Sequence, residues 1–232
     1  MYKNYYFDLY GTLVDVVTNE NKDEVWEKMI LYYGYYGAVY TPEEMKDIFD
    51  KTKKKLLGLS SGPVPTINIE DVFYKLFKNK DIKPKKKYTK SVAKAFRMLT
   101  TESIHLIDGT REVLEKLKED NKNVYIISND QSLYGLSELK LLGVDKYFDD
   151  YYFASDMGIS MPDENFMKKV LDESKGKAKE SLIISNNLDK VIKSSSKMDS
   201  VFLYDTEDIN VKNVSKYTIE KNNIRNILKV ID

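Results

Sequence analysis

The 232-residue chain contains no cysteine, which excludes disulfide bonds, thiolate ligands and thiol nucleophiles. Its single histidine, His105, has no second histidine or cysteine with which to build a familiar zinc site. Lys plus Arg and Asp plus Glu each total 37, so no net charge favours nucleic acid or an acidic membrane as a partner. No apolar run approaches the length of a membrane span. We therefore expect a soluble, cytoplasmic protein.

Apolar periodicity divides the chain into an all-helical part and an alternating part. Between about residues 17 and 102, apolar positions recur at spacings of three and four, which predicts helices. From Asp108 onward, single helices alternate with short apolar strands, which predicts right-handed crossovers and a mostly parallel sheet. The expected fold is α/β: a Rossmann-like core of residues 1–16 and 103–232, with residues 17–102 inserted as a helical cap.

The pattern also gives element boundaries. The cap helices are expected over 22–34, from a Thr41 cap towards Leu57, over 69–78 and over 89–99. The first core strand is expected to end at Asp8. The other core strands are expected over 124–128, 151–154, 181–185 and 200–204. The core helices are expected from an Asp108 cap through Lys118, over 133–142, from Pro162 onward and over 188–197.

The opening segment places a lone carboxylate, Asp8, directly after an apolar strand and before a Gly11-Thr12 turn. At that end of the first strand of an α/β sheet, a carboxylate lies in the crevice where such folds bind ligands. The segment resembles the first motif of the haloacid dehalogenase-like (HAD) hydrolases, whose first Asp is a nucleophile. Tyr10 stands where the family's metal-using phosphatases have Asp, and Asp-x-Tyr-Gly-Thr is the form of its 2-haloacid dehalogenases. The resemblance implies catalytic roles for Asp8, Tyr10 and Thr12, and substrate binding by Gly11.

A second strand, 124–128, ends in Ser128 and Asn129 and resembles the second HAD motif. The resemblance implies that Ser128 donates a hydrogen bond to an oxygen of the substrate or intermediate, with Asn129 beside it in the catalytic set. Ser and Asn are also common at strand ends and helix N-caps, so a structural role is the alternative.

The third motif departs from the family, which has a lysine before the proline of residues 158–163, where this chain has Met161. That lysine normally neutralises the nucleophile, and a thioether cannot do so. Lys168 or Lys169 would have to reach back roughly 9 to 11 Å along the helix expected after Pro162. Lys168 is retained as a substrate-binding candidate, with a solvated surface lysine as the alternative.

The segment 183–191 resembles the fourth motif in two ways. Aligned to the phosphatase form, the acidic metal-binding positions fall on Asn187, or on Asn186, and on Val191. An amide oxygen is a poorer Mg²⁺ ligand than a carboxylate. This alignment implies a weakened Mg²⁺ site formed by Asp8, the Tyr10 backbone carbonyl and Asn187.

Aligned instead to the dehalogenase form, the same segment matches at Ser185, Asn186 and Asp189, and no cofactor is implied. In that family these residues orient water and the ester intermediate, so Asn186 and Asp189 join the catalytic candidates and Ser185 the substrate-binding ones. The dehalogenases also hold the departing halide with an arginine that follows the first motif. None of the arginines here, Arg97, Arg111 and Arg225, has that place.

Three classes of function remain. The first is a HAD-like hydrolase in which Asp8 attacks a small phosphorylated or halogenated substrate, with activity weakened by the missing motif charges. The second is a catalytically degenerate protein that binds a small molecule or anion. The third is a protein-interaction module, with a dense tyrosine cluster in the cap as its surface. The cluster is equally compatible with packing of the cap, a substrate cavity or a homodimer contact, and consists of Tyr32, Tyr33, Tyr35, Tyr36 and Tyr40.

Overall fold

The computed structural model describes residues 2–60, 64–190, 198–205 and 215–231. The chain forms two compact units, one of Met1–Val16, Gly62–Val64 and Ile104–Asp232 and the other of Val17–Ser61 and Pro65–Ser103. We call them the core and the cap. Within the described residues, no helix combines the length and the apolar character needed to cross a lipid bilayer.

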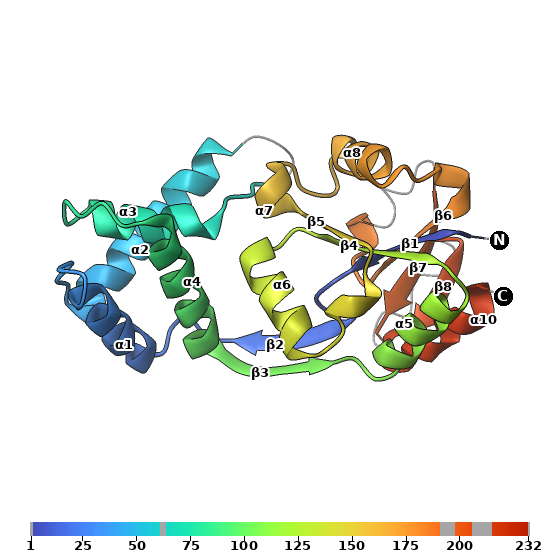
Figure 1. Ribbon diagram of the computed structural model, residues 1–232, viewed down its shortest axis with the longest axis horizontal. Helices are drawn as coiled ribbons and strands as arrows, with labels where there is room; N and C mark the ends of the chain where they lie inside the picture. Colours follow the sequence, from blue (N-terminus) through green and yellow to red (C-terminus); the bar gives the residue numbers. More distant parts are fainter. Residues whose placement is uncertain (1, 61–63, 191–197, 206–214, 232) are drawn as a thin grey trace. The chain divides into compact units, whose positions relative to one another are not determined.

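A six-stranded sheet forms the centre of the core, with the strand order β5-β4-β1-β6-β7-β8 and parallel pairing throughout (Figure 1). Its strands are β1 (Asn4–Asp8), β4 (Asn123–Ser128), β5 (Asp150–Phe153), β6 (Ser181–Ser185), β7 (Asp199–Tyr204) and β8 (Tyr217–Glu220). The chain leaves β1 on one side through β4 and β5 and returns to its other side at β6, so β1 lies at a topological switch point. The predicted α/β fold with a mostly parallel sheet is confirmed.

Strand register brings three strand ends together. Asp8 pairs with Ile127 of β4, so Ser128 follows directly beside it. Phe7 pairs with Ile184 of β6, which places Ser185 on the other side. Neighbouring strands lie about 4.8 Å apart, and side chains from all three therefore meet at the carboxyl edge of the sheet.

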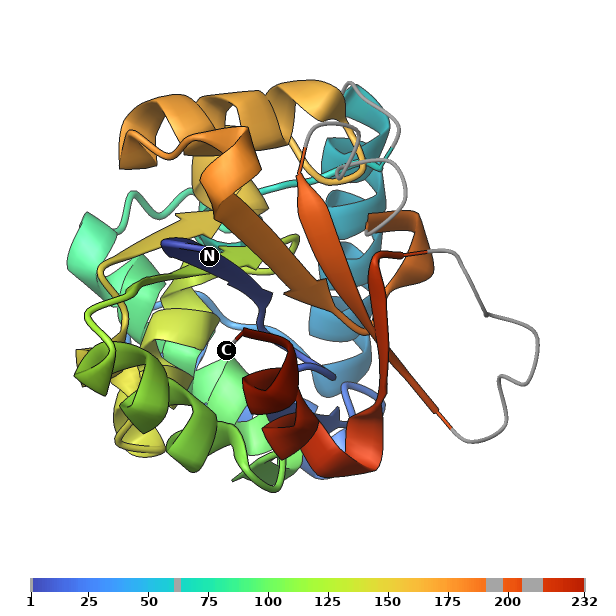
Figure 2. The same cartoon turned by 90° about the vertical axis from the view of Figure 1, so that its right-hand side faces the viewer.

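Helices cover both faces of the sheet (Figure 2). One face packs Phe7, Ile126 and Ile184 among residues of α5, α6 and the C-terminal η3 segment. The other face packs Tyr6 and Ile127 among residues of α8. The helical elements of the core are α5 (Thr110–Glu119), α6 (Ser132–Leu141), η1 (Asp145–Tyr147), α7 (Ala154–Met157), α8 (Glu164–Ser174), η2 (Ala178–Glu180), η3 (Lys221–Ile227) and α10 (Leu228–Ile231). Burial on both faces explains why the central strands are nearly all apolar rather than alternating.

The cap consists of four helices packed around aromatic side chains. They are α1 (Asp23–Gly34), α2 (Pro42–Leu59), α3 (Ile69–Lys78) and α4 (Lys86–Thr100). Phe49 of α2 lies 5.1 to 5.5 Å, between ring centroids, from Trp26, Phe73 and Phe96 of the other three helices. This one side chain therefore ties all four helices together.

Several predicted boundaries are wrong for identifiable reasons. Gly109, in a left-handed conformation with φ 87°, precedes α5, and the Asp108 carboxylate is instead paired with Arg225. Asp163 caps α8, so this helix begins after Pro162. The 17–102 segment, predicted to be all helical, also includes the end of β2 (Val14–Thr18) and the start of β3 (Thr101–Leu106), which pair as a two-stranded sheet. Most of the helix predicted over 188–197 lies outside the described residues.

Replacing Phe49 by Ala should destabilise the cap by about 3 to 5 kcal/mol, because a fully buried ring is lost from a packed cluster. Trp26 is the only tryptophan of the chain and is buried against Phe49, so its fluorescence during urea unfolding reports on the cap. Tyr35→Ala is the matched control, since Tyr35 is 90% exposed and should leave the transition unchanged. Equal unfolding of the two variants would contradict the role of Phe49.

Candidate active site

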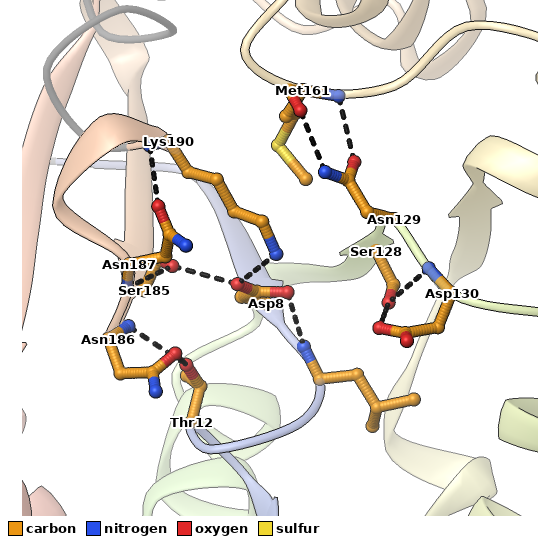
Figure 3. A network of polar contacts seen from close by, with 11 residues as sticks. Asp8, Thr12, Ser128, Asn129, Asp130, Met161, Ser185, Asn186, Asn187 and Lys190 are labelled. Atoms are coloured by element: carbon orange, nitrogen blue, oxygen red, sulfur yellow. Dashed lines mark hydrogen bonds and ion pairs between the residues drawn. The ribbon is translucent and has the colours of Figure 1, made fainter. Parts of the chain in front are cut away.

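Asp8 is the most deeply buried carboxylate of the site, with a relative exposure of 1%. Its Oδ1 accepts a hydrogen bond from the backbone N–H of Leu9 at 3.0 Å. Its Oδ2 accepts one from the Ser185 hydroxyl at 2.8 Å and pairs with the Lys190 ammonium at 2.7 Å (Figure 3). The two oxygens are therefore unequal: both side-chain donors face Oδ2, and Oδ1 has the backbone contact.

Lys190 comes from the segment that follows β6. The Asn187 side-chain oxygen accepts from the Lys190 backbone N–H at 3.0 Å, as a helix N-cap residue does. The Asn187 N–H in turn donates to Ser185 Oγ at 3.0 Å. The same short turn thus directs both Ser185 and Lys190 at one oxygen of Asp8.

A second set of contacts joins this turn to the loop after β1. Thr12 Oγ1 accepts from the Asn186 backbone N–H at 3.1 Å and donates to the Asn186 side-chain oxygen at 3.3 Å. Gly11 has a φ of 72°, and a Cβ there would lie 2.3 Å from Asn186 Nδ2. Any other residue at position 11 would therefore be strained and would displace the Asn186 side chain that Thr12 contacts. Gly11 and Thr12 hold the loops in register rather than facing Asp8.

The residues predicted from the second motif have partners of their own. Ser128 Oγ donates to the Asp130 carboxylate at 2.8 Å, and the Asp130 N–H donates back to Ser128 Oγ at 3.2 Å. The Asn129 amide donates to the Met161 carbonyl at 2.7 Å and accepts from the Met161 N–H at 2.8 Å. Asn129 therefore fixes the backbone of Met161 at the same edge of the sheet (Figure 3).

Three other predicted residues have different surroundings. The Tyr10 hydroxyl donates to the buried Glu138 carboxylate of α6 at 2.5 Å. Asp189 lies in the Lys190 turn and is exposed. Lys168 is exposed on α8 and makes no hydrogen bond or ion pair within the described part of the chain.

Lys190 and Glu138 are the residues that sequence reasoning missed. Lys190 adjoins Asp189 in the fourth motif, so a search for a cation near any strand end of the sheet would have considered it. For Glu138 the signal is weaker: a carboxylate on an otherwise apolar helix face.

The donor set does not fit the Mg²⁺ site that the phosphatase alignment implies. Of its three ligands, the Asn187 side-chain oxygen accepts the Lys190 N–H, and Asp8 Oδ2 contacts an ammonium. No group of three or more His, Cys, Asp or Glu side chains gathers to hold a metal ion among the described residues. Mg²⁺ requires oxygen ligands in near-octahedral geometry, and a neighbouring cation opposes it.

The family model of haloacid dehalogenase-like hydrolases matches residues 2–193. The chain belongs to this family. No curated protein sequence matches it significantly.

Solved structures of HAD proteins share the fold over nearly the whole chain. A dehalogenase in an intermediate complex has a TM-score of 0.61 at 15% identity, covering 99% of this chain and 96% of its own. A putative beta-phosphoglucomutase from Thermotoga maritima has 0.58 at 18%, covering 99% and 100%. The putative HAD hydrolase YfnB from Bacillus subtilis, bound to magnesium, has 0.55 at 17%, covering 98% of each chain. At these identities the likeness shows the fold alone.

Replacing Thr12 by Val should cost about 1 to 3 kcal/mol, because Val keeps the shape but leaves the Asn186 N–H without its acceptor. Thr12→Ser keeps the hydroxyl and is the control. Urea unfolding compares the two free energies. The role of the Thr12 hydroxyl would be refuted by a Val variant as stable as the Ser variant.

Proposed function

We propose that the protein is a hydrolase in which Asp8 Oδ1 attacks a small phosphorylated or halogenated substrate. The asymmetry of the Asp8 contacts carries this proposal. Oδ2 faces the Ser185 hydroxyl and the Lys190 ammonium, whereas Oδ1 has its hydrogen bond from the Leu9 N–H. Oδ1 therefore keeps more of its electron density for attack, and the carboxylate is held in one orientation.

The reaction would proceed in two steps. Attack by Oδ1 forms an acyl phosphate with a phosphorylated substrate or an ester with a halogenated one, and the leaving group departs with the electron pair of its bond. Water then hydrolyses this covalent intermediate and restores the Asp8 carboxylate. A halide departs without a proton, whereas an alkoxide must receive one.

The surroundings of Asp8 favour leaving groups that need no proton. Tyr10 stands where the phosphatases of the family have the Asp that donates a proton to the leaving group, and its hydroxyl donates to Glu138. A phenol with a pKa of about 10 is also a weak acid near neutral pH. We therefore propose slow turnover of alkyl phosphates, and faster reaction of substrates with an activated leaving group.

A catalytically degenerate protein that binds a small ligand or a protein partner is the second candidate. The observation in its favour is the Ser128 hydroxyl, which donates to Asp130 rather than pointing a free hydrogen at a substrate oxygen. The missing halide arginine points the same way.

Asp8→Asn should abolish turnover, because the amide is not a nucleophile at carbon or phosphorus. The test measures product release from p-nitrophenyl phosphate, an alkyl phosphate and 2-chloropropionate, by the native chain and by Asp8→Asn. Mass spectrometry of quenched reactions should detect the acyl phosphate or the ester on Asp8 in the native chain alone. Turnover that survives in Asp8→Asn would refute the proposed nucleophile. A native chain without turnover on any of the three would support the degenerate candidate.

Asp130→Asn should lower the KM for p-nitrophenyl phosphate about fivefold, because it removes the negative charge that contacts Ser128, whose repulsion of a bound phosphate would cost about 1 kcal/mol. Binding of uncharged ligands should not change. KM measured at low and high salt provides the check, since added salt screens the effect. An unchanged KM at low salt would show that phosphate does not approach Asp130.

A further inference from the structure

The chain has Met161 where the resemblance expects a lysine, and it places a different lysine, Lys190, against the Asp8 carboxylate. Met161 is 1% exposed. The cation that contacts Asp8 is Lys190, from the segment after β6. A buried carboxylate needs a paired cation to remain ionised at low energetic cost, and this one comes from a different element of the fold.

Lys190 is held on Asp8 and is not a freely moving surface lysine. Its side chain is 13% exposed, against 1% for Asp8, and the Nζ–Oδ2 distance is 2.7 Å. Asn187 fixes its backbone, and Ser185 shares the oxygen that it contacts. The ion pair of Lys118 with Asp149, by contrast, lies at the surface, with side-chain exposures of 33% and 40%.

We propose that Lys190 supplies the positive charge that position 161 has lost, and that its ammonium stands in for a divalent metal at Asp8. This proposal rests on the proposed function, since it concerns the charge beside the attacking carboxylate. As the ester forms, Asp8 gives up its negative charge. The ammonium is then available to the charge that develops on the bound group.

The same contact opposes metal binding. A divalent ion at Oδ2 would lie against the ammonium, and the two positive charges repel in a site with little water. The Asn187 oxygen that could join it is used by the Lys190 N–H. We therefore expect the proposed attack by Asp8 to proceed without a metal ion.

Metal binding is tested first, because it needs no turnover. Calorimetric titration with Mn²⁺ should show no binding to the native chain. Lys190→Asp replaces the ammonium with a second carboxylate, and it should bind Mn²⁺ with an affinity at least tenfold above the detection limit of the titration. That gain should disappear in Lys190→Asp combined with Asp8→Asn. Mn²⁺ binding by the native chain that is lost in Asp8→Asn would overturn the proposal.

Measurements of turnover test whether the positive charge of Lys190 assists the reaction at Asp8. Lys190→Met should lower kcat at least a hundredfold with a smaller change in KM, and adding Met161→Lys should restore kcat to within tenfold of native. If Lys190 had only a structural role, a lysine at position 161 would not restore kcat. Lys179→Met, at an exposed lysine of η2, is the matched control and should leave kcat unchanged. Addition of a chelator should not change the kcat of the native chain.

Lys190→Arg separates an effect on stability from an effect on the reaction, because it keeps the positive charge. It is the variant to measure if Lys190→Met does not fold. A folded Arg variant should retain measurable, chelator-resistant turnover. Native kcat in folded Lys190→Met, or loss of native turnover with chelator, would contradict the proposal. If the native chain turns over no substrate, the proposed function fails, and the Mn²⁺ titrations still decide whether Lys190 replaces a metal.

Discussion

The ion pair between Asp8 and Lys190 is the contact on which the organisation of this site depends. A carboxylate that is 1% exposed loses nearly all of its hydration, and ionisation there is costly unless a cation and hydrogen-bond donors replace the water. Lys190, Ser185 and the Leu9 N–H together supply that replacement. Removing one partner of such a pair leaves an uncompensated buried charge. Every residue that positions Lys190 is therefore also needed to keep the charge of Asp8 compensated.

Those residues belong to two loops that must stay in fixed register. The loop after β1 presents Asp8, and the turn after β6 presents Ser185 and Lys190. Thr12 joins the loops through two hydrogen bonds to Asn186, and Gly11 allows their close approach. Several residues that resemble catalytic motif positions thus contribute here by holding Asp8 and its cation together, which is a geometric role rather than a chemical one.

Much of this arrangement was predictable from the pattern of residues. Asp8 and Ser185 end apolar strands, and parallel strands end at one edge of a sheet, so their place at a common edge follows from periodicity, whereas their proximity depends on the pairing of β1 with β6. Lys190 was not predictable in that way, because its direction depends on how the Asn187 cap turns the chain after β6. The Ser128–Asp130 and Tyr10–Glu138 contacts are likewise set by rotamers and by the orientation of α6, which a linear pattern does not encode.

The position of the cation also bears on how the fold tolerates change in its motifs. The carboxyl edge of a parallel sheet gathers the ends of several strands within a few ångströms. A charge needed at Asp8 can therefore be delivered from the loop after β6 as well as from the segment around Met161, which Asn129 holds at the same edge. The constraint is on the electrostatic field at Asp8 and not on the strand that supplies the charge. A motif that lacks its lysine is for that reason weak grounds for concluding that the charge itself is absent.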